Sequence, residues 1–170
     1  NYEPTLSTRL IERFVNDDLS NWHVRLSRRR FWKTDSSNEK ISAFITLYEC
    51  LISVSQLIAP FAPFFADWLY KNLIEGSNEN KSNEIVSVHL STLPIQNDSW
   101  VNLDLERRMN YAQRISSLVL SLRKSEKIRV RQPLSKILLP ILDENFQSDI
   151  KLVEDLIKAE VNVKDIELLE

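Results

Sequence analysis

The spacing of apolar residues predicts a protein built mainly from α-helices. Leucine, isoleucine and aromatic residues recur at steps of three and four over Glu39–Ile58 and Leu103–Lys124, as they do along one face of a helix. The same spacing runs through Thr5–Lys33, either as one helix or as two with a bend near Asn16–Asp18. Prolines then interrupt the pattern, and a further helix is expected over Pro63–Gly76. We therefore predict a helical bundle.

The hydrophobic period changes near the boundary Gln132–Pro133. Lys136–Leu142 is β-rich, Ser148–Ala159 is amphipathic with helical spacing, and Val163–Leu168 again has the pattern of a strand. A strand, a helix and a strand joined by short links form a βαβ unit. We predict a helical domain over residues 1–132 and a small α+β (βαβ) domain over residues 133–170.

Aromatic residues cluster after the two prolines. We interpret the cluster as core packing and not as a binding cage, because large aromatic side chains usually contribute to cores. Its members are Phe61, Phe64, Phe65, Trp68 and Tyr70. Farther along, Ile85–Pro94 is too short and too alternating for a helix, and we predict an extended segment that lies along the bundle.

The composition excludes several classes of site. Gly76 is the only glycine, which excludes a dinucleotide-binding fingerprint and a P-loop. Cys50 is the only cysteine, and His23 and His89 lack the spacing of metal ligands. No arrangement of serine, cysteine and histidine suggests a nucleophile with its base. We expect no catalytic residue, metal site or cofactor in this chain.

The chain is also predicted to be soluble and to occupy a reducing compartment. A single cysteine provides no disulfide framework. No apolar run approaches the roughly 20 residues that span a bilayer, and no signal peptide opens the chain. We expect no membrane partner.

The net charge of −2 conceals two basic segments and an acidic one. Residues 19–32, LSNWHVRLSRRRFW, contain four arginines and three aromatic residues but no acidic residue. Residues 114–131 carry six basic residues against Glu126 alone, a balance of +5. Residues 143–170 carry nine acidic residues and three lysines, a balance of −6. This uneven distribution suggests that one face of the protein meets a polyanion.

Basic helices interleaved with aromatic residues suit RNA. Lysine and arginine neutralise phosphates, and aromatic or guanidinium planes accept unstacked bases. Solvated helix faces and ion pairs with acids such as Asp17 give the same pattern, and a helical wheel shows that the arginines cannot all face one ligand. We expect the two basic segments to meet on one flank of the helical body. The predicted RNA-binding residues are Arg25, Arg28, Arg29, Arg30, Trp32, Lys33, Arg123, Lys127, Arg129 and Arg131.

Four segments also carry a family resemblance. In order they are DDLSNWHVRLSRRRFW, APFAPFFADWLY, SVHLSTLP and IRVRQPL, and the closing NVKDIELLE adds a fifth. Together they resemble the C-terminal part of isoleucyl-tRNA synthetases, a family of class I aminoacyl-tRNA synthetases. SNWHVR and RVRQPL separate the chain from the valyl, leucyl and methionyl enzymes, which are the nearest alternatives. His23 departs from the family, in which tyrosine is more usual.

The resemblance implies an anticodon-binding helical bundle followed by a small junction domain, with tRNA as the partner. The two domains would anchor tRNA so that its acceptor end reaches a catalytic domain that precedes this region in the family. The His-Ile-Gly-His-like and Lys-Met-Ser-Lys-like signatures of that domain are absent from the sequence. ATP, Mg²⁺ and isoleucine would therefore bind the cytoplasmic parent enzyme and not this chain.

Two further expectations concern protein partners. Family members usually have a helix before the one that begins near Pro4, so Leu6, Leu10 and Phe14 are expected to present uncovered apolar surface that supports self-association. Composition without the resemblance also leaves open a helical protein-interaction module that binds no nucleic acid. Such a module would show flat, weak binding to tRNA as the salt concentration changes.

Overall fold

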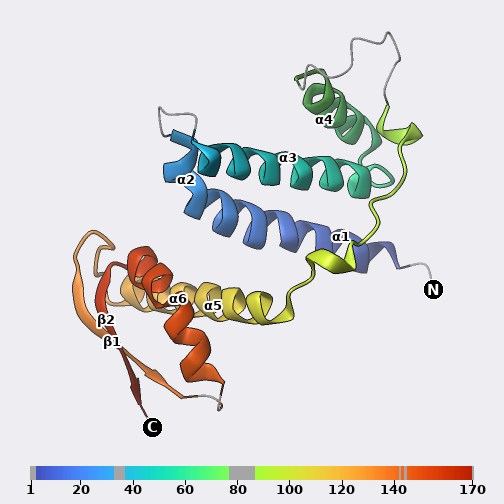
Figure 1. The fold of residues 1–170 in the computed structure, drawn as a ribbon. Helices are drawn as coiled ribbons and strands as arrows, with labels where there is room; N and C mark the ends of the chain where they lie inside the picture. Colours follow the sequence, from blue (N-terminus) through green and yellow to red (C-terminus); the bar gives the residue numbers. More distant parts are fainter. Residues whose placement is uncertain (1–2, 33–36, 77–86, 142, 144, 170) are drawn as a thin grey trace. The chain divides into compact units, whose positions relative to one another are not determined.

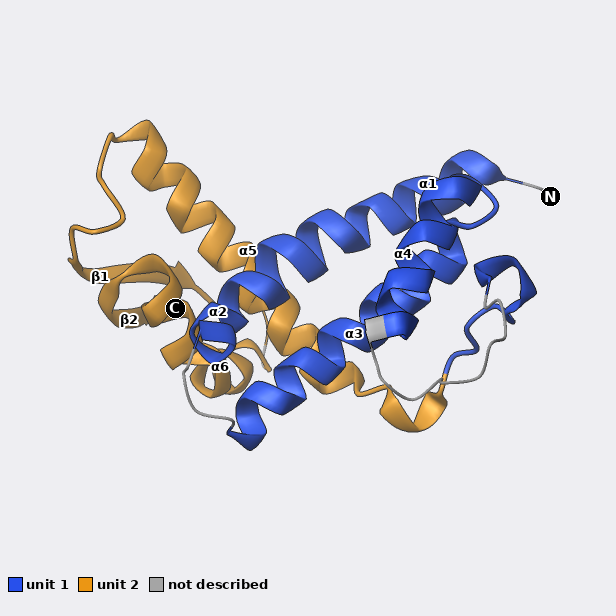
Figure 2. Ribbon diagram, turned by 90° about the horizontal axis from the view of Figure 1, so that it is seen from above, with its two compact units in different colours: residues 1–96 blue, residues 97–170 orange. Residues whose placement is uncertain are grey.

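A computed structural model describes residues 3–32, 37–76, 87–141, 143 and 145–169. The chain forms two compact units, residues 1–96 and residues 97–170, shown in separate colours in Figure 2. The units divide at Gln96–Asn97, and the long helix that follows packs against later elements of the second unit. The domain boundary predicted at Gln132–Pro133 stays a prediction.

The first unit opens with a continuous run of helix that has three parts. These are α1 (Pro4–Arg13), the π-helix η1 (Phe14–Val24) and α2 (Arg25–Trp32). Pro4 occupies the first turn, where a missing N–H removes no intrahelical hydrogen bond. Where a bend was one expectation, the backbone widens into i→i+5 hydrogen bonding instead.

Helix α3 (Asn38–Ile58) lies beside this first run of helix in Figure 1 and contacts all three of its parts. Ser37 caps it by accepting a hydrogen bond from the Lys40 N–H. Phe44 of α3 packs against Phe31 of α2, with ring centroids 4.9 Å apart. The helix matches the predicted Glu39–Ile58 to within one residue.

The hydropathy of α3 corrects the prediction that no apolar segment is long enough to span a bilayer. Its 21 residues are long and apolar enough to cross a membrane, judged by length and composition alone. The mostly buried core helix of a soluble protein passes the same test, so length and composition alone are weak evidence for a membrane span. In this structure α3 packs against α2, η1 and α4.

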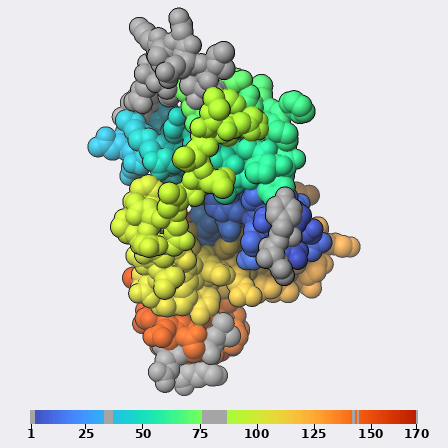
Figure 3. Space-filling view, turned by 90° about the vertical axis from the view of Figure 1, so that its right-hand side faces the viewer, coloured from blue at the N-terminus to red at the C-terminus, as the bar shows by residue number. Residues whose placement is uncertain are grey.

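Helix α4 (Pro63–Gly76) packs against the end of α3 and against the segment that begins at Ser87. Ala66, Tyr70 and Val88 form a small buried cluster at this contact. Figure 3 shows the segment, in yellow-green, lying against the green surface of α4. Part of it, Val88–Leu90, is a 3₁₀ turn where we predicted extended chain, and the predicted segment's first two residues lie outside the described ranges.

The predicted aromatic core is wrong for most of its members. Only Tyr70 is buried, whereas Phe64 is 91% exposed, and Phe65 and Trp68 are more than half exposed. Of these residues, Phe64, Phe65 and Trp68 lie on α4, whose contacts with α3 and with the segment that begins at Ser87 bury Ala66 and Tyr70. One packed face cannot cover them all.

The second unit contains the predicted βαβ unit. A 3₁₀ turn (Asp98–Trp100) precedes helix α5 (Leu103–Ser125), and the chain continues through β1 (Leu134–Pro140), α6 (Phe146–Val161) and β2 (Val163–Leu169). The two strands pair in parallel, with Leu134 opposite Val163. The predicted class, mainly α with a small α+β part, is confirmed.

Helix α5 packs against α6 through polar and aromatic contacts. Asp149 is buried and accepts hydrogen bonds from the guanidinium groups of Arg107, at 2.7 and 3.3 Å, and of Arg108, at 3.0 Å. Tyr111 packs edge-on against Phe146, with centroids 5.1 Å apart. The hydrogen bonds from Arg107 and then Arg108 hold the pKa of Asp149 below its usual value, so this carboxylate stays ionised in its buried position.

Candidate nucleic-acid interface

Helix α2 displays the first basic segment. Ser27 is buried and Phe31 is partly buried, and these two positions, four residues apart, turn one face of the helix toward α3. Arg28, Arg29 and Arg30 lie off that face and are exposed. The last residue of the helix, Trp32, is 82% exposed, which is unusual for so large an apolar ring.

Only some of the cations in this segment interact with other groups of the protein. Among the residues described, Arg28 and Arg29 form no ion pair, and they remain available to a ligand. Arg25 is exposed but already interacts with another group in the chain. Lys33, the last predicted member, lies outside the described residues.

His23 lies inside the π-helix and is partly buried. Burial, followed by the positive charge of Arg30, lowers the pKa of His23 below its usual value. The imidazole is therefore neutral at pH 7 and adds no charge to the basic segment.

The second basic segment ends, after α5, in a loop with a defined shape. The Ile128 N–H donates to the carbonyl of Arg123 at 2.8 Å, and the Lys127 N–H donates to that of Lys124 at 3.2 Å. Lys127 itself is left-handed, with a φ of 57°. This is the Schellman arrangement of a helix C-terminus, with lysine at the position that glycine usually occupies.

The structure contradicts the prediction that Arg123 contacts RNA. The residue is 2% exposed, because it follows Ala112, Ile115 and Val119 on the buried face of α5. Its guanidinium donates to the main-chain carbonyls of Arg129 and Gln132. A side chain that is enclosed and bonded in this way cannot reach a ligand.

The remaining cations of this segment are on the surface. Lys127, Arg129 and Arg131 are exposed, and no ion pair involves them in the described part of the chain. Several acidic groups of the second unit are instead paired with other cations: Asp149 with Arg107 and Arg108, and Glu167 with Lys136. The loop therefore keeps its positive charge despite the acidic sequence that follows.

Sequence reasoning missed Asn162, which supports the same loop. It ends α6 in the left-handed conformation, with a φ of 53°, and its side-chain amide donates to the Val130 carbonyl at 2.8 Å. Its own carbonyl accepts from Arg123 and from the Leu134 N–H. Asparagine directly after an amphipathic helix is a known stop signal and could have indicated the left-handed turn, but not the contact with Val130.

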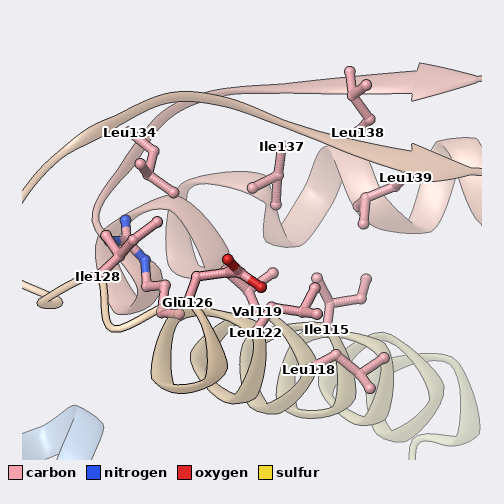
Figure 4. Close-up of a pocket in the computed structure, with 11 residues that line it drawn as sticks. Ile115, Leu118, Val119, Leu122, Glu126, Ile128, Leu134, Ile137, Leu138 and Leu139 are labelled. Carbon is pink, nitrogen blue, oxygen red and sulfur yellow. The ribbon is translucent and has the colours of Figure 1, made fainter.

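A groove of about 320 Å³ lies beside the loop within the second unit. Figure 4 shows Ile115, Val119 and Leu122 of α5 on one side of it, and Leu134, Ile137 and Leu139 of β1 on the other. Its walls are almost entirely apolar, apart from Arg123 and Glu126 at one end. Such a lining suits neither phosphate nor catalysis.

Nothing in the described part of the chain suits a metal ion, because no three histidine, cysteine, aspartate or glutamate side chains come together there. The candidate interface consists of an exposed basic helix, α2, that ends in tryptophan, and an exposed basic loop after α5 whose backbone is held by Arg123.

A model of the anticodon-binding domain of tRNA ligases matches residues 1–138. The chain belongs to this family.

Relatives of the anticodon-binding domain include three isoleucine–tRNA ligases. That of Cytophaga hutchinsonii is 52% identical over 169 residues, and that of Bacteroides fragilis is 48% identical; each match covers 99% of this chain. That of Dehalococcoides mccartyi is 37% identical over 96% of the chain. The chain spans only 14–16% of the length of these relatives. The family resemblance drawn from the sequence is confirmed.

Proposed function

We propose that this chain is the tRNA-binding region of an isoleucine–tRNA ligase and anchors the anticodon stem and loop of tRNA(Ile). The observation that carries the proposal is that Arg28 and Arg29 of α2, and Arg129 and Arg131 of the loop after α5, are exposed and form no ion pair among the described residues, in a chain that belongs to an anticodon-binding family. Arg28, Arg29, Arg129 and Arg131 would bind phosphates, and Trp32 would stack on an unpaired base. That the two basic segments serve one tRNA stays a prediction.

The parent enzyme is proposed to carry out aminoacylation elsewhere in its length. ATP, Mg²⁺ and isoleucine would bind its catalytic domain in the cytoplasm. This chain would contribute position alone, by fixing the tRNA so that the acceptor end reaches that domain. The exposed side chains of Leu6, which is 60% exposed, Leu10 and Phe14 support the further proposal that another part of the parent or a second copy covers them.

Trp32 and Arg29 provide a matched test, because both are exposed on α2 but are assigned different contacts. Trp32→Ala should weaken binding of a tRNA(Ile) transcript by about 1–3 kcal/mol and leave the salt dependence unchanged. Arg29→Gln should lower the slope of log affinity against log salt by roughly 0.7–0.9. Filter binding between about 50 and 200 mM salt measures both quantities.

Neither substitution should change the melting temperature, since neither side chain is buried. If the unaltered chain binds tRNA weakly and with no dependence on salt, the protein-interaction module is the better account. If Arg29→Gln lowers the melting temperature and leaves tRNA affinity intact, Arg29 has a structural role.

A further inference from the structure

We propose that Arg123 is a positioning residue for RNA binding, which fixes the shape of the basic loop 126–133 from inside the protein. The inference rests on the proposed function and adds how one part of the interface is built. It starts from the finding that the most buried arginine among the described residues belongs to the same basic segment as the exposed ones.

The first observation is where the guanidinium donates. One of its terminal nitrogens, Nη1, lies 3.2 Å from the carbonyl of Arg129 and 3.0 Å from that of Gln132. These two carbonyls stand on either side of Arg131 in the chain. A single nitrogen therefore closes the stretch that carries Arg131 and holds it against α5.

The second observation is that Asn162 connects Arg123 to another residue of the loop, Val130. Nη2 of Arg123 donates to the Asn162 carbonyl at 3.0 Å, and the Asn162 side chain donates to the Val130 carbonyl at 2.8 Å. The carbonyls of Arg129, Val130 and Gln132 are thus each held by a hydrogen bond, while the side chains of Arg129 and Arg131 are exposed. Holding the backbone inside leaves the charges outside.

The third observation concerns charge. Within the described residues, no carboxylate pairs with Arg123, and the partners of its guanidinium are carbonyl dipoles. A buried guanidinium needs hydrogen bonds to offset the loss of water, and its planar fork can serve several acceptors at fixed angles. Because no negative charge cancels it, its positive charge adds to the field that the loop presents to a polyanion.

The functional consequence is a smaller entropy loss on binding. A loop that is already held in one shape orders less when RNA binds, so more of the interaction energy appears as affinity. Lysine at this position would keep the charge, but one ammonium group could not hold the carbonyls of Arg129, Gln132 and Asn162 in the same planar geometry.

The test uses the full chain and a tRNA(Ile) transcript, with affinity measured as a function of salt. Arg123→Lys should weaken binding about tenfold near 0.1 M salt and speed amide hydrogen exchange in residues 128–134. Asn162→Gly provides a second variant, because glycine keeps the left-handed turn and the carbonyl but removes the side-chain amide. It should produce the same two changes to a smaller extent, and it carries the test if Arg123→Lys does not fold.

A further variant separates positioning from general destabilisation. Replacing Lys127, Arg129 and Arg131 together by glutamine removes the charges of the loop and leaves its inner hydrogen bonds intact. Adding Arg123→Lys to that triple variant should cause no further loss of tRNA affinity, because Arg123 acts through those charges. A further tenfold loss would overturn the proposal.

Two failures can be told apart. If the unaltered chain does not bind tRNA in a salt-dependent way, the proposed function fails and this inference fails with it. If the unaltered chain binds and both Arg123→Lys and Asn162→Gly retain full affinity, the proposed function stands and the positioning role is overturned.

Discussion

Lys127 combines an unfavourable backbone conformation with an exposed positive charge. Its φ of 57° lies in the left-handed region, where the Cβ of any residue other than glycine is crowded. Glycine is the usual residue at this point of a Schellman motif. The choice of lysine makes sense if its charge serves a ligand.

Lys127→Gly should therefore raise stability and lower RNA affinity at the same time. Relief of the left-handed strain should increase the free energy of unfolding by about 1 kcal/mol, measured by urea denaturation. Loss of one phosphate contact should reduce the salt slope for tRNA by roughly 0.7–0.9.

Lys127→Ala is the control for this prediction. It removes the same charge but keeps a Cβ, so it should reduce the salt slope equally and give no comparable gain in stability. A glycine variant with unchanged tRNA binding would show that the lysine charge is not used.

Single residues also show where sequence reasoning stopped. The cations of the loop were recognised from the sequence, and the structure exposes Lys127, Arg129 and Arg131. The sequence places Arg123 with them because it belongs to the same basic segment, residues 114–131. It lies four positions after Val119 on the buried face of α5, but its partners come from as far as Asn162, and no local pattern indicates such a contact.

At the scale of elements, the joint between α4 and the segment after Ser87 depends on one carboxylate. Asp67 accepts hydrogen bonds from the Ser87 hydroxyl at 2.7 Å and the Val88 N–H at 3.1 Å, and pairs with Lys71 at 2.6 Å. The bond with Lys71, then that with Ser87, lower the pKa of Asp67 to about 2. The contact keeps Val88 in the buried cluster with Ala66 and Tyr70.

The sign of the pH dependence follows from the lowered pKa. Because the folded chain holds the proton on Asp67 less tightly than the unfolded chain does, this stabilisation is complete above about pH 4 and is lost as the pH falls toward 2. Asp67→Asn should lower stability at pH 7 and flatten the pH profile between pH 4 and 2, measured by thermal melts in a series of buffers.

Asp155→Asn gives the reference for that experiment. Asp155 is exposed on α6, and its substitution should leave both the midpoint at pH 7 and the acid limb of the profile unchanged. Equal acid sensitivity in the Asp67→Asn variant and the unaltered chain would show that this carboxylate does not control the acid response.

The elements themselves were predictable to different degrees. The α3 and α5 helices follow a clear apolar period and have polar N-caps, and their predicted ends agree with the structure to within one residue. The π-helix was not predictable, since its wider turn leaves no distinct signature in the order of residues. A helical wheel drawn at 100° per residue therefore misplaces the side chains between Phe14 and Val24 around the helix axis.

At the scale of the whole molecule, binding should depend on where the charges are and not on their sum. The chain carries a net charge of −2, so tRNA as a polyanion is not attracted by the protein as a whole. The cations must act locally. Burial and pairing select which of the 22 lysines and arginines remain available, and that selection could not be read from the sequence.

Arg129→Gln and Lys151→Gln test whether the position of a charge matters, because the two variants have the same net charge. Each removes one positive charge from an exposed side chain, on the basic loop and on α6 respectively. Arg129→Gln should reduce tRNA affinity and the salt slope by roughly one phosphate contact, whereas Lys151→Gln should change neither. Equal effects of the two substitutions, measured by filter binding across a salt series, would mean that net charge governs binding.

The way Arg123 holds the loop has a consequence for how the surface can change. Its partners are main-chain carbonyls, which every amino acid possesses, so the side chains at 129 and 131 can be exchanged without loss of any of these hydrogen bonds. The backbone conformation of the loop is in this respect independent of the side chains at these two positions. Acidic, aromatic or small residues placed there would be displayed in the same fixed arrangement, which makes this stretch a natural starting point for redirecting the domain to other ligands.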